Sequence, residues 1–258
     1  MARIAVQIYE IQDPREAEVV IELDVDRIGS VILSEENWKV PAIKDAILIS
    51  KGARVKHSLI PLFHTRGVLF QAIEYYRPDI IHFCECLTND DGHFMPCEVL
   101  VDLQICVRER FPEIEVMRSV PIATPRNSKR MPTLEIAKRF ESASDYFLTD
   151  TWLGKEPVEG YIGITGRTSD WTVARRLVDL TSIPVILAGG LSSENVYEGV
   201  MDVKPFGVDS CTRTNGVDSS GRPVRFKKDP DKVRAFVQEV RRAEKDLFSM
   251  KIQSKGRK

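Results

Sequence analysis

The chain has 258 residues, of which 43% are hydrophobic and 29% are charged, and its formal net charge at pH 7 is -1. This balance is typical of a folded globular protein, and the net charge gives no indication of a nucleic-acid or membrane partner. No apolar run approaches the roughly 20 residues of a membrane span, and the first residues lack the apolar core of a signal peptide.

The chain contains five cysteines, an odd number at irregular spacing. A chain of this length does not need disulfides to fold, so the sequence favours reduced thiols and a cytoplasmic location. We expect no cofactor, no nucleic-acid partner and no membrane association. The sequence does not set the oligomeric state, and it is compatible with a homo-oligomer.

Short apolar segments alternate with amphipathic segments along the chain. We expect strands at residues 4–9, 28–33, 57–63, 80–83, 115–120, 146–149, 184–188 and 207–210. Helical periodicity and capping residues predict helices at 14–23, 40–50, 67–76, 97–110, 133–142, 169–180, 193–202 and 230–247. This alternation predicts an α/β protein of the (β/α)8 TIM-barrel class. We expect one barrel over residues 1–248 and a frayed basic tail over 249–258.

The segment 183–196 carries the clearest signal for a binding site. An apolar strand ends at Gly189 and Gly190, and Ser192 then opens a predicted helix. Free backbone N–H groups at such a turn can hold an anion, and glycines let the anion approach closely. An ordinary strand-to-helix turn has the same pattern, so this segment alone leaves both interpretations open.

In a barrel of this class the chemistry lies at the carboxyl ends of the strands. Asp150 follows the sixth predicted strand, and Thr212 and Arg213 follow the eighth. The loops after strands seven and eight commonly hold phosphate in such barrels, and Arg213 adds a forked donor.

Residues 163–177, 184–196, 204–210 and 228–236 resemble the phosphoribosylanthranilate isomerase family in order, spacing and motif identity. The specific match covers roughly residues 145–242, and residues 6–17 and 26–29 resemble the family's first strands more faintly. The resemblance implies a TIM barrel that performs an Amadori rearrangement of a phosphorylated aminoaldose in tryptophan biosynthesis. Its class would be isomerase, an intramolecular oxidoreductase.

This reaction needs an acid for the furanose ring oxygen and a base for the proton on the adjacent sugar carbon. The resemblance implies that Asp150 is the acid. The family's base is a cysteine at the end of the first strand, where this chain has Tyr9. Tyr9, with an ordinary pKa near 10, would be a poor base. Glu10 is chemically better, although neighbouring strand residues point to opposite faces. We predict that Tyr9 and Asp150 face each other across the barrel mouth.

Other family positions are also altered. The arginine that the family has after its second strand lacks a clear counterpart in residues 34–39. The family's Ser-Ser-Gly phosphate loop aligns either with residues 211–213 or, after an insertion, with 214–216, which would bring Gly216 to the phosphate. The predicted phosphate-binding set is therefore Gly189, Gly190, Thr212, Arg213 and Gly216.

These substitutions leave three functions open. The chain is an Amadori isomerase of the family's kind, or a paralogue with altered chemistry on another sugar phosphate, or a barrel that binds a phosphate ligand without catalysis. Each of them takes a small-molecule sugar phosphate as its partner. Asp209, at the end of the eighth strand, would face the barrel or support the phosphate loop.

A second cluster of candidate ligands follows the fourth strand. His82, Cys84 and Cys86 alternate along the chain, and His93 and Cys97 follow. Imidazole and thiolate suit zinc, but the spacing matches no standard zinc site. Scattered thiols and histidines without metal are the stronger interpretation, so His82, Cys84 and Cys86 are only weak metal candidates.

Overall fold

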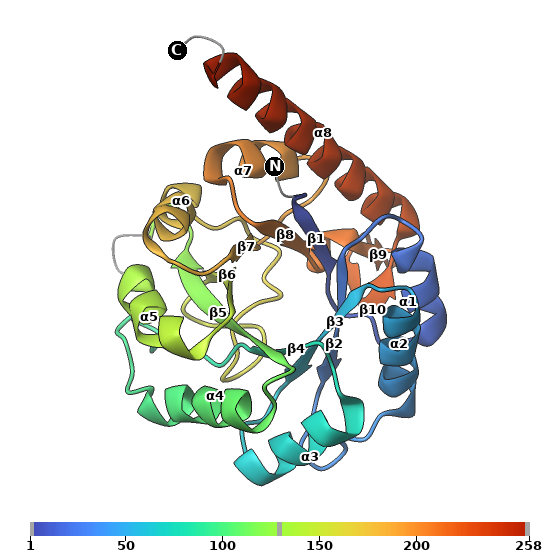
Figure 1. Cartoon of the computed structure of the whole chain (residues 1–258), viewed down its shortest axis with the longest axis vertical. Helices are drawn as coiled ribbons and strands as arrows, with labels where there is room; N and C mark the ends of the chain where they lie inside the picture. The colour runs from blue at the N-terminus through green and yellow to red at the C-terminus, as the bar shows by residue number, and fades with distance from the viewer. Residues whose placement is uncertain (1–2, 128–130, 256–258) are drawn as a thin grey trace.

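The computed structural model describes residues 3–127 and 131–255. Eight parallel strands, paired in chain order from β1 to β8 and back to β1, form a closed barrel, which confirms the predicted (β/α)8 class (Figure 1). The strands are β1 (Ala5–Ile8), β2 (Arg27–Ile32), β3 (Lys56–Pro61), β4 (Ile80–Phe83), β5 (Glu115–Ala123), β6 (Tyr146–Trp152), β7 (Val185–Leu187) and β8 (Gly207–Ser210).

Helices surround the barrel (Figure 1). They are α1 (Pro14–Ile21), α2 (Pro41–Gly52), α3 (Arg66–Tyr76), α4 (Glu98–Arg110), α5 (Thr133–Phe140), α6 (Trp171–Leu180), α7 (Val196–Val203) and α8 (Pro230–Lys255), with 3-10 turns η2 (Glu141–Ala143) and η3 (Thr212–Thr214). The capping signals act as expected at α1, where the Asp13 side chain accepts hydrogen bonds from the N–H groups of Arg15 and Glu16.

The alternation of strand residues decides which side chains reach the site. In β1, Val6 and Ile8 belong to an apolar core cluster that includes Val233 and Phe236 of α8. Gln7, between them, hydrogen-bonds to a side chain of β8 inside the barrel. The next residue on that inner side, Tyr9, therefore also points into the barrel.

A hairpin after β8 was not predicted. Strands β9 (Asn215–Val217) and β10 (Pro223–Lys228) pair antiparallel, with Pro223 opposite Val217 and Lys228 opposite Asn215. The Lys228 ammonium donates to the carbonyl of Cys211 at 3.0 Å and to Asn215 Oδ1 at 2.5 Å. These contacts fasten the hairpin to the barrel beside the end of β8.

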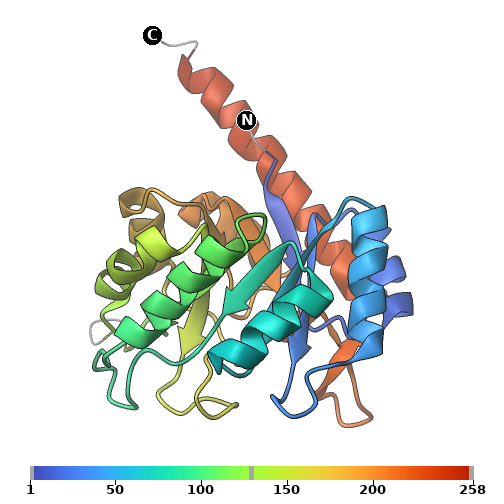
Figure 2. The same cartoon turned by 60° about the horizontal axis from the view of Figure 1, so that its bottom comes forward.

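The last helix is longer than predicted. Helix α8 continues past residue 247 to Lys255, so most of the segment expected to be a frayed tail over 249–258 is helical. Figures 1 and 2 show this helix extending beyond the barrel. Among the residues that the structure describes, no helix has both the length and the apolar composition needed to span a membrane.

Candidate active site

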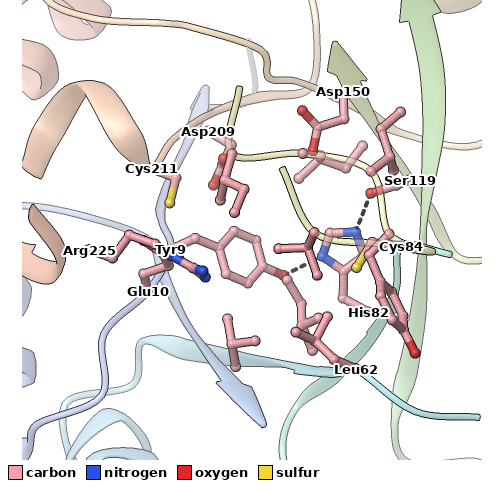
Figure 3. A pocket seen from close by; sticks show the side chains of 18 residues that line it. Tyr9, Glu10, Leu62, His82, Cys84, Ser119, Asp150, Asp209, Cys211 and Arg225 are labelled. Carbon is pink, nitrogen blue, oxygen red and sulfur yellow. Dashed lines mark hydrogen bonds and ion pairs between the residues drawn. The ribbon is translucent and has the colours of Figure 1, made fainter. Parts of the chain in front are cut away.

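Two adjoining cavities lie at the carboxyl ends of the strands. The apolar cavity, with an open space of about 600 Å³, is lined by Tyr9, Glu10, Val31, Ile60, Leu62, His82, Cys84, Ser119, Leu148, Asp150, Val158, Tyr161, Ile162, Gly163, Ile164, Asp209, Cys211 and Arg225 (Figure 3). The donor-lined cavity, of about 350 Å³, is lined by Asp150, Ile164, Thr165, Gly166, Ala188, Gly189, Gly190, Leu191, Asp209, Ser210, Cys211, Thr212 and Arg213. Asp150 and Asp209 border both cavities, so two carboxyl groups stand where they meet.

Asp150 comes from β6 and is the predicted acid. Its carboxyl oxygen Oδ1 accepts a hydrogen bond from the backbone N–H of Thr151 at 2.9 Å. Gly163 lies so close that a Cβ there would be 2.6 Å from Asp150 Oδ2, and this glycine has a φ of +123°. Burial raises the pKa of Asp150 to about 7, although the hydrogen bond from Thr151 opposes the shift. Asp150 can therefore carry a proton near neutral pH.

Asp209 comes from β8, opposite Gln7 of β1 in the parallel register. Its Oδ1 accepts a hydrogen bond from Gln7 Nε2 at 3.2 Å, and the residue is 7% exposed. Burial raises the pKa of Asp209 to about 8, with a further contribution from the charge of Asp150. Asp209 thus faces the site as well as the barrel interior. The carboxyl groups of Asp150 and Asp209 interact where the two cavities meet.

Tyr9 lines the same cavity as Asp150, but its surroundings do not make it a base. Its hydroxyl contacts Ser58 Oγ at 2.5 Å and His82 Nδ1 at 2.6 Å. Burial raises the pKa of the Tyr9 hydroxyl well above 10, so the phenol keeps its proton at neutral pH.

The Tyr9 hydroxyl belongs to a chain of hydrogen bonds across the barrel interior. His82 joins Tyr9 through Nδ1 and Ser119 through Nε2, the latter at 2.9 Å (Figure 3). Burial lowers the pKa of His82 to about 3, so its ring is neutral. The chain Ser58–Tyr9–His82–Ser119 connects β3, the residue after β1, β4 and β5, so Tyr9 has a structural role.

Glu10 faces the apolar cavity, which settles the question that the sequence left open. Its side chain reaches the cavity because the residue has a φ of +64°, a left-handed conformation that ends the strand alternation. Its Oε1 receives the Arg225 guanidinium at 2.7 Å from Nε and 2.5 Å from Nη2. The Glu10 carboxylate is therefore held by an ion pair with the hairpin.

The donor-lined cavity contains four of the five predicted phosphate ligands. The backbone N–H groups of Gly189, Gly190 and Leu191 donate to no acceptor within the described residues. Both glycines have positive φ, and a Cβ at Gly190 would lie 2.5 Å from the carbonyl carbon of Arg167. Arg213 reaches the same cavity and donates from Nε to Gly166 O at 3.1 Å. Unpaired N–H groups beside a guanidinium suit an anion.

Gly216 lies apart from the other predicted phosphate ligands. It belongs to β9 and does not line the donor-lined cavity, whereas Thr212 and Arg213 do. The alignment of the phosphate loop with residues 211–213 therefore agrees better with the geometry than the alignment with 214–216.

The cysteine and histidine cluster does not assemble. His82 and Cys84 line the apolar cavity, but Cys86 lines a separate surface cavity, and His82 is already bonded to Tyr9 and Ser119. Within residues 3–127 and 131–255, no three histidine, cysteine or acidic side chains are grouped to hold a metal ion.

Sequence reasoning missed two residues of the site. Arg225 has no assignment from the sequence, and Asp209 is expected there only to face the barrel or to support the phosphate loop. The alternation of residues in β8 could have indicated Asp209, because this residue lies near the end of the strand at a position whose side chain points into the barrel. No local pattern marked Arg225, since its position depends on the hairpin.

The sequence pattern of the family described as N-(5'phosphoribosyl)anthranilate (PRA) isomerase matches residues 109–239, about half of the chain. N-(5'-phosphoribosyl)anthranilate isomerase 1 of Methanosarcina mazei is 29% identical over 233 residues, covering 88% of this chain and 91% of the relative. The isomerase of Haloferax volcanii is 46% identical over a shorter stretch of 93 residues, or 36% of this chain and 37% of its own length.

Solved structures of similar fold include the isomerase of Pyrococcus furiosus, with a TM-score of 0.64 and 23% identity over 93% of this chain and all of that one. Another is a phosphoribosyl anthranilate isomerase in complex with reduced 1-(o-carboxyphenylamino)-1-deoxyribulose 5-phosphate, with a TM-score of 0.61 and 21% identity over 92% of this chain and 98% of that one. These likenesses agree with the closed barrel. Since the family pattern spans half of the sequence, this chain belongs to the phosphoribosylanthranilate isomerase family.

Proposed function

We propose that this protein catalyses the Amadori rearrangement of N-(5'-phosphoribosyl)anthranilate, as an isomerase of tryptophan biosynthesis. The observation that carries the proposal is the pair Asp150 and Asp209 at the junction of an apolar and a donor-lined cavity. The ligand named for the structurally similar isomerase has a carboxyphenyl group at one end and a phosphate at the other. A molecule of that kind would place its sugar at the junction.

The rearrangement needs two proton movements and no external oxidant. An acid protonates the furanose ring oxygen, the bond from that oxygen to C1 breaks, and C1 becomes doubly bonded to nitrogen. A base then takes the proton from C2, and the electron pair of the C2–H bond moves toward nitrogen to give an enol-amine. Tautomerisation completes the ketone at C2, so C2 is oxidised as C1 is reduced.

In this proposal Asp150 donates the proton to the ring oxygen and Asp209 accepts the proton from C2. Burial raises both pKa values toward neutrality, where a carboxyl group serves best as either acid or base. Because the two groups interact, they titrate as a pair, and the reactive form holds one proton, on Asp150, while Asp209 is ionised. Asp209 thus takes the part that Tyr9 cannot take with a raised pKa.

The donor-lined cavity would hold the phosphate, through the free N–H groups of Gly189, Gly190 and Leu191 and through Arg213. Thr212 lines the same cavity. For the cellular setting, we infer a reducing compartment such as the cytoplasm, because the described cysteines are all unpaired.

The test is turnover of phosphoribosylanthranilate by the purified protein, together with rescue of a tryptophan-requiring host that lacks this enzyme. Asp150→Asn and Asp209→Asn should each lower turnover by about 10²- to 10⁴-fold. Asp170→Asn is the matched control, since that aspartate caps α6 through Thr172 N and lines neither cavity.

Two outcomes would contradict the proposal. Absence of turnover by the wild type, with phosphate binding retained, would indicate another sugar phosphate as substrate or a barrel that only binds. Full turnover by Asp209→Asn would show that another group removes the proton.

A further inference from the structure

The apolar cavity has a single cationic side chain among the residues that line it. That residue is Arg225 of β10, since the His82 ring in the same cavity is neutral. Much of the remaining wall is aliphatic or aromatic and includes Val31, Ile60 and Leu62. A flat, apolar group with one negative charge would find matching surfaces here.

Arg225 is held from behind by Glu10. Two of its nitrogens, Nε and Nη2, contact the same oxygen, Oε1 of Glu10. The Glu10 side chain is 2% exposed, whereas the Arg225 side chain is 40% exposed. The carboxylate is therefore on the protein side of the pair and the guanidinium on the open side. Figure 3 shows both side chains at the Tyr9 end of the cavity.

This arrangement is costly for the fold. Glu10 adopts a φ of +64°, which is unfavourable for a residue other than glycine. Its second oxygen, Oε2, is buried and has no hydrogen-bond partner among the described residues. Backbone strain and an unpaired buried oxygen concentrate at sites where position matters for function.

We propose that Arg225 binds the carboxylate of the substrate's aromatic ring and so determines selectivity for a carboxylated aryl amine. This inference rests on the proposed function and specifies how its substrate is recognised. A guanidinium has five N–H donors, and Glu10 engages only two of its three nitrogens. The remaining donors can bind a second carboxylate in forked geometry. The Phe226 ring, with its centroid 4.6 Å from the guanidinium carbon, helps to fix the cation.

The position of Arg225 on the hairpin is consistent with phosphate binding in the donor-lined cavity and with the carboxyl pair as the reacting groups. Arg225 lines only the apolar cavity and Arg213 lines only the donor-lined one, whereas Asp150 and Asp209 border both cavities. A substrate with one end in each cavity would have its sugar near Asp150 and Asp209, which border both.

The experiment compares two substrates in wild type and variants: phosphoribosylanthranilate and the same phosphoribosyl adduct of aniline, which lacks the carboxylate. Arg225→Gln should raise KM for the carboxylated substrate by about 10- to 100-fold, the loss expected for hydrogen bonds between charged groups. It should leave KM for the aniline adduct unchanged. Arg222→Gln is the matched control, because Arg222 lies just before β10 and is 80% exposed in a pair with Asp218.

A second variant separates recognition from simple support of the hairpin. Glu10→Gln leaves the guanidinium in place without its partner charge, and the preference for the carboxylated substrate should persist. If Arg225→Gln and Glu10→Gln raise KM equally for both substrates, Arg225 only fastens the hairpin and the inference is wrong.

A binding measurement keeps this test separate from that of the proposed function. Calorimetry with 2-aminobenzoate and with aniline, each in the presence of inorganic phosphate, reports recognition of the ring without turnover. If the wild type binds 2-aminobenzoate more tightly than aniline and Arg225→Gln abolishes this preference, the inference is supported even if the wild type turns over neither substrate. Equal binding of the two rings by the wild type would overturn it.

Discussion

The two cavities of the site are built in different ways. The donor-lined cavity depends on backbone: Gly189 and Gly190 take positive φ and leave N–H groups unpaired. The apolar cavity depends on side chains that come from distant segments, such as Tyr9 bonded to His82 and Glu10 bonded to Arg225. Backbone geometry depends on short local sequence motifs, whereas a side-chain network changes when a single residue is replaced. The family resemblance is accordingly clear at the first cavity and faint at the second.

Gly190→Val would test the backbone-built cavity most severely. A Cβ at this position would lie 2.5 Å from the Arg167 carbonyl carbon and 2.8 Å from Thr168 N, and φ is +61°. The loop must therefore move, and the N–H groups lose their convergence. Since each hydrogen bond to a charged group contributes about 1.5–3 kcal/mol, the loss of two should weaken binding of a sugar phosphate at least about 100-fold.

Calorimetry with ribose 5-phosphate and with inorganic phosphate would measure this change, beside a thermal melt that verifies folding. Gly221→Ala serves as control, because Gly221 also has a positive φ, +79°, but open space around its Cβ position. Unchanged affinity in Gly190→Val would place the phosphate elsewhere.

Tyr9→Phe tests the side-chain network at the other cavity. Removing the hydroxyl leaves Ser58 and His82 Nδ1 without their partner in a buried space. We expect the free energy of unfolding to fall by about 1–3 kcal/mol, while turnover is retained. Chemical denaturation and a turnover assay give the two quantities.

Tyr161→Phe is the matched control for this variant. Tyr161 lines the same cavity, and its hydroxyl makes no hydrogen bond with the described residues, so stability should change little. A loss of turnover in Tyr9→Phe comparable to that in Asp150→Asn would restore Tyr9 as a reacting group.

The sequence predicted the features that follow from periodicity and glycine. The barrel, the place of Asp150 at the end of β6 and the glycine turn after β7 all follow from strand alternation or φ requirements within a few residues. It could not show that Glu10 faces the cavity, because the φ of +64° interrupts the alternation on which the prediction relied. Nor could it place Arg225, which lies 215 residues from its partner along the chain.

The pH dependence of kcat/KM tests the roles of Asp150 and Asp209, the carboxyl pair where the two cavities meet. The pKa of Asp150 is raised to about 7 and that of Asp209 to about 8, so the form of the pair that holds one proton is most populated between these values. We expect a bell-shaped profile with its maximum between pH 7 and 8. Outside the two pKa values, kcat/KM should fall about tenfold per pH unit. A flat profile from pH 6 to 9 would contradict the assignment of Asp150 and Asp209 as the acid and the base.

The last expected effect is on the pH dependence of stability, and it has a definite sign. The pKa of Asp209 is raised in the folded protein, chiefly by burial, from 3.8 to about 8. Between these values the folded state holds a proton that the unfolded state releases, so this group makes stability fall as pH rises. Asp209→Asn removes the titration, and the melting temperature of the variant should therefore decline less between pH 5 and 8.5.

At pH 8.5 Asp209→Asn should melt higher than the wild type by about 2–4 °C for each kcal/mol of desolvation relieved. Asp218→Asn gives a contrast of opposite sign, because hydrogen bonds, first from Ser220, lower the pKa of Asp218 and its stabilisation is lost as pH falls. Scanning calorimetry from pH 5 to 8.5 measures the slope due to Asp209, and scans at and below pH 3.8, the ordinary pKa of Asp218, measure the slope due to Asp218. If Asp209→Asn kept the wild-type slope, Asp209 would ionise freely in the folded protein. Its place between the two cavities would then lack the electrostatic basis for exchanging a proton with Asp150.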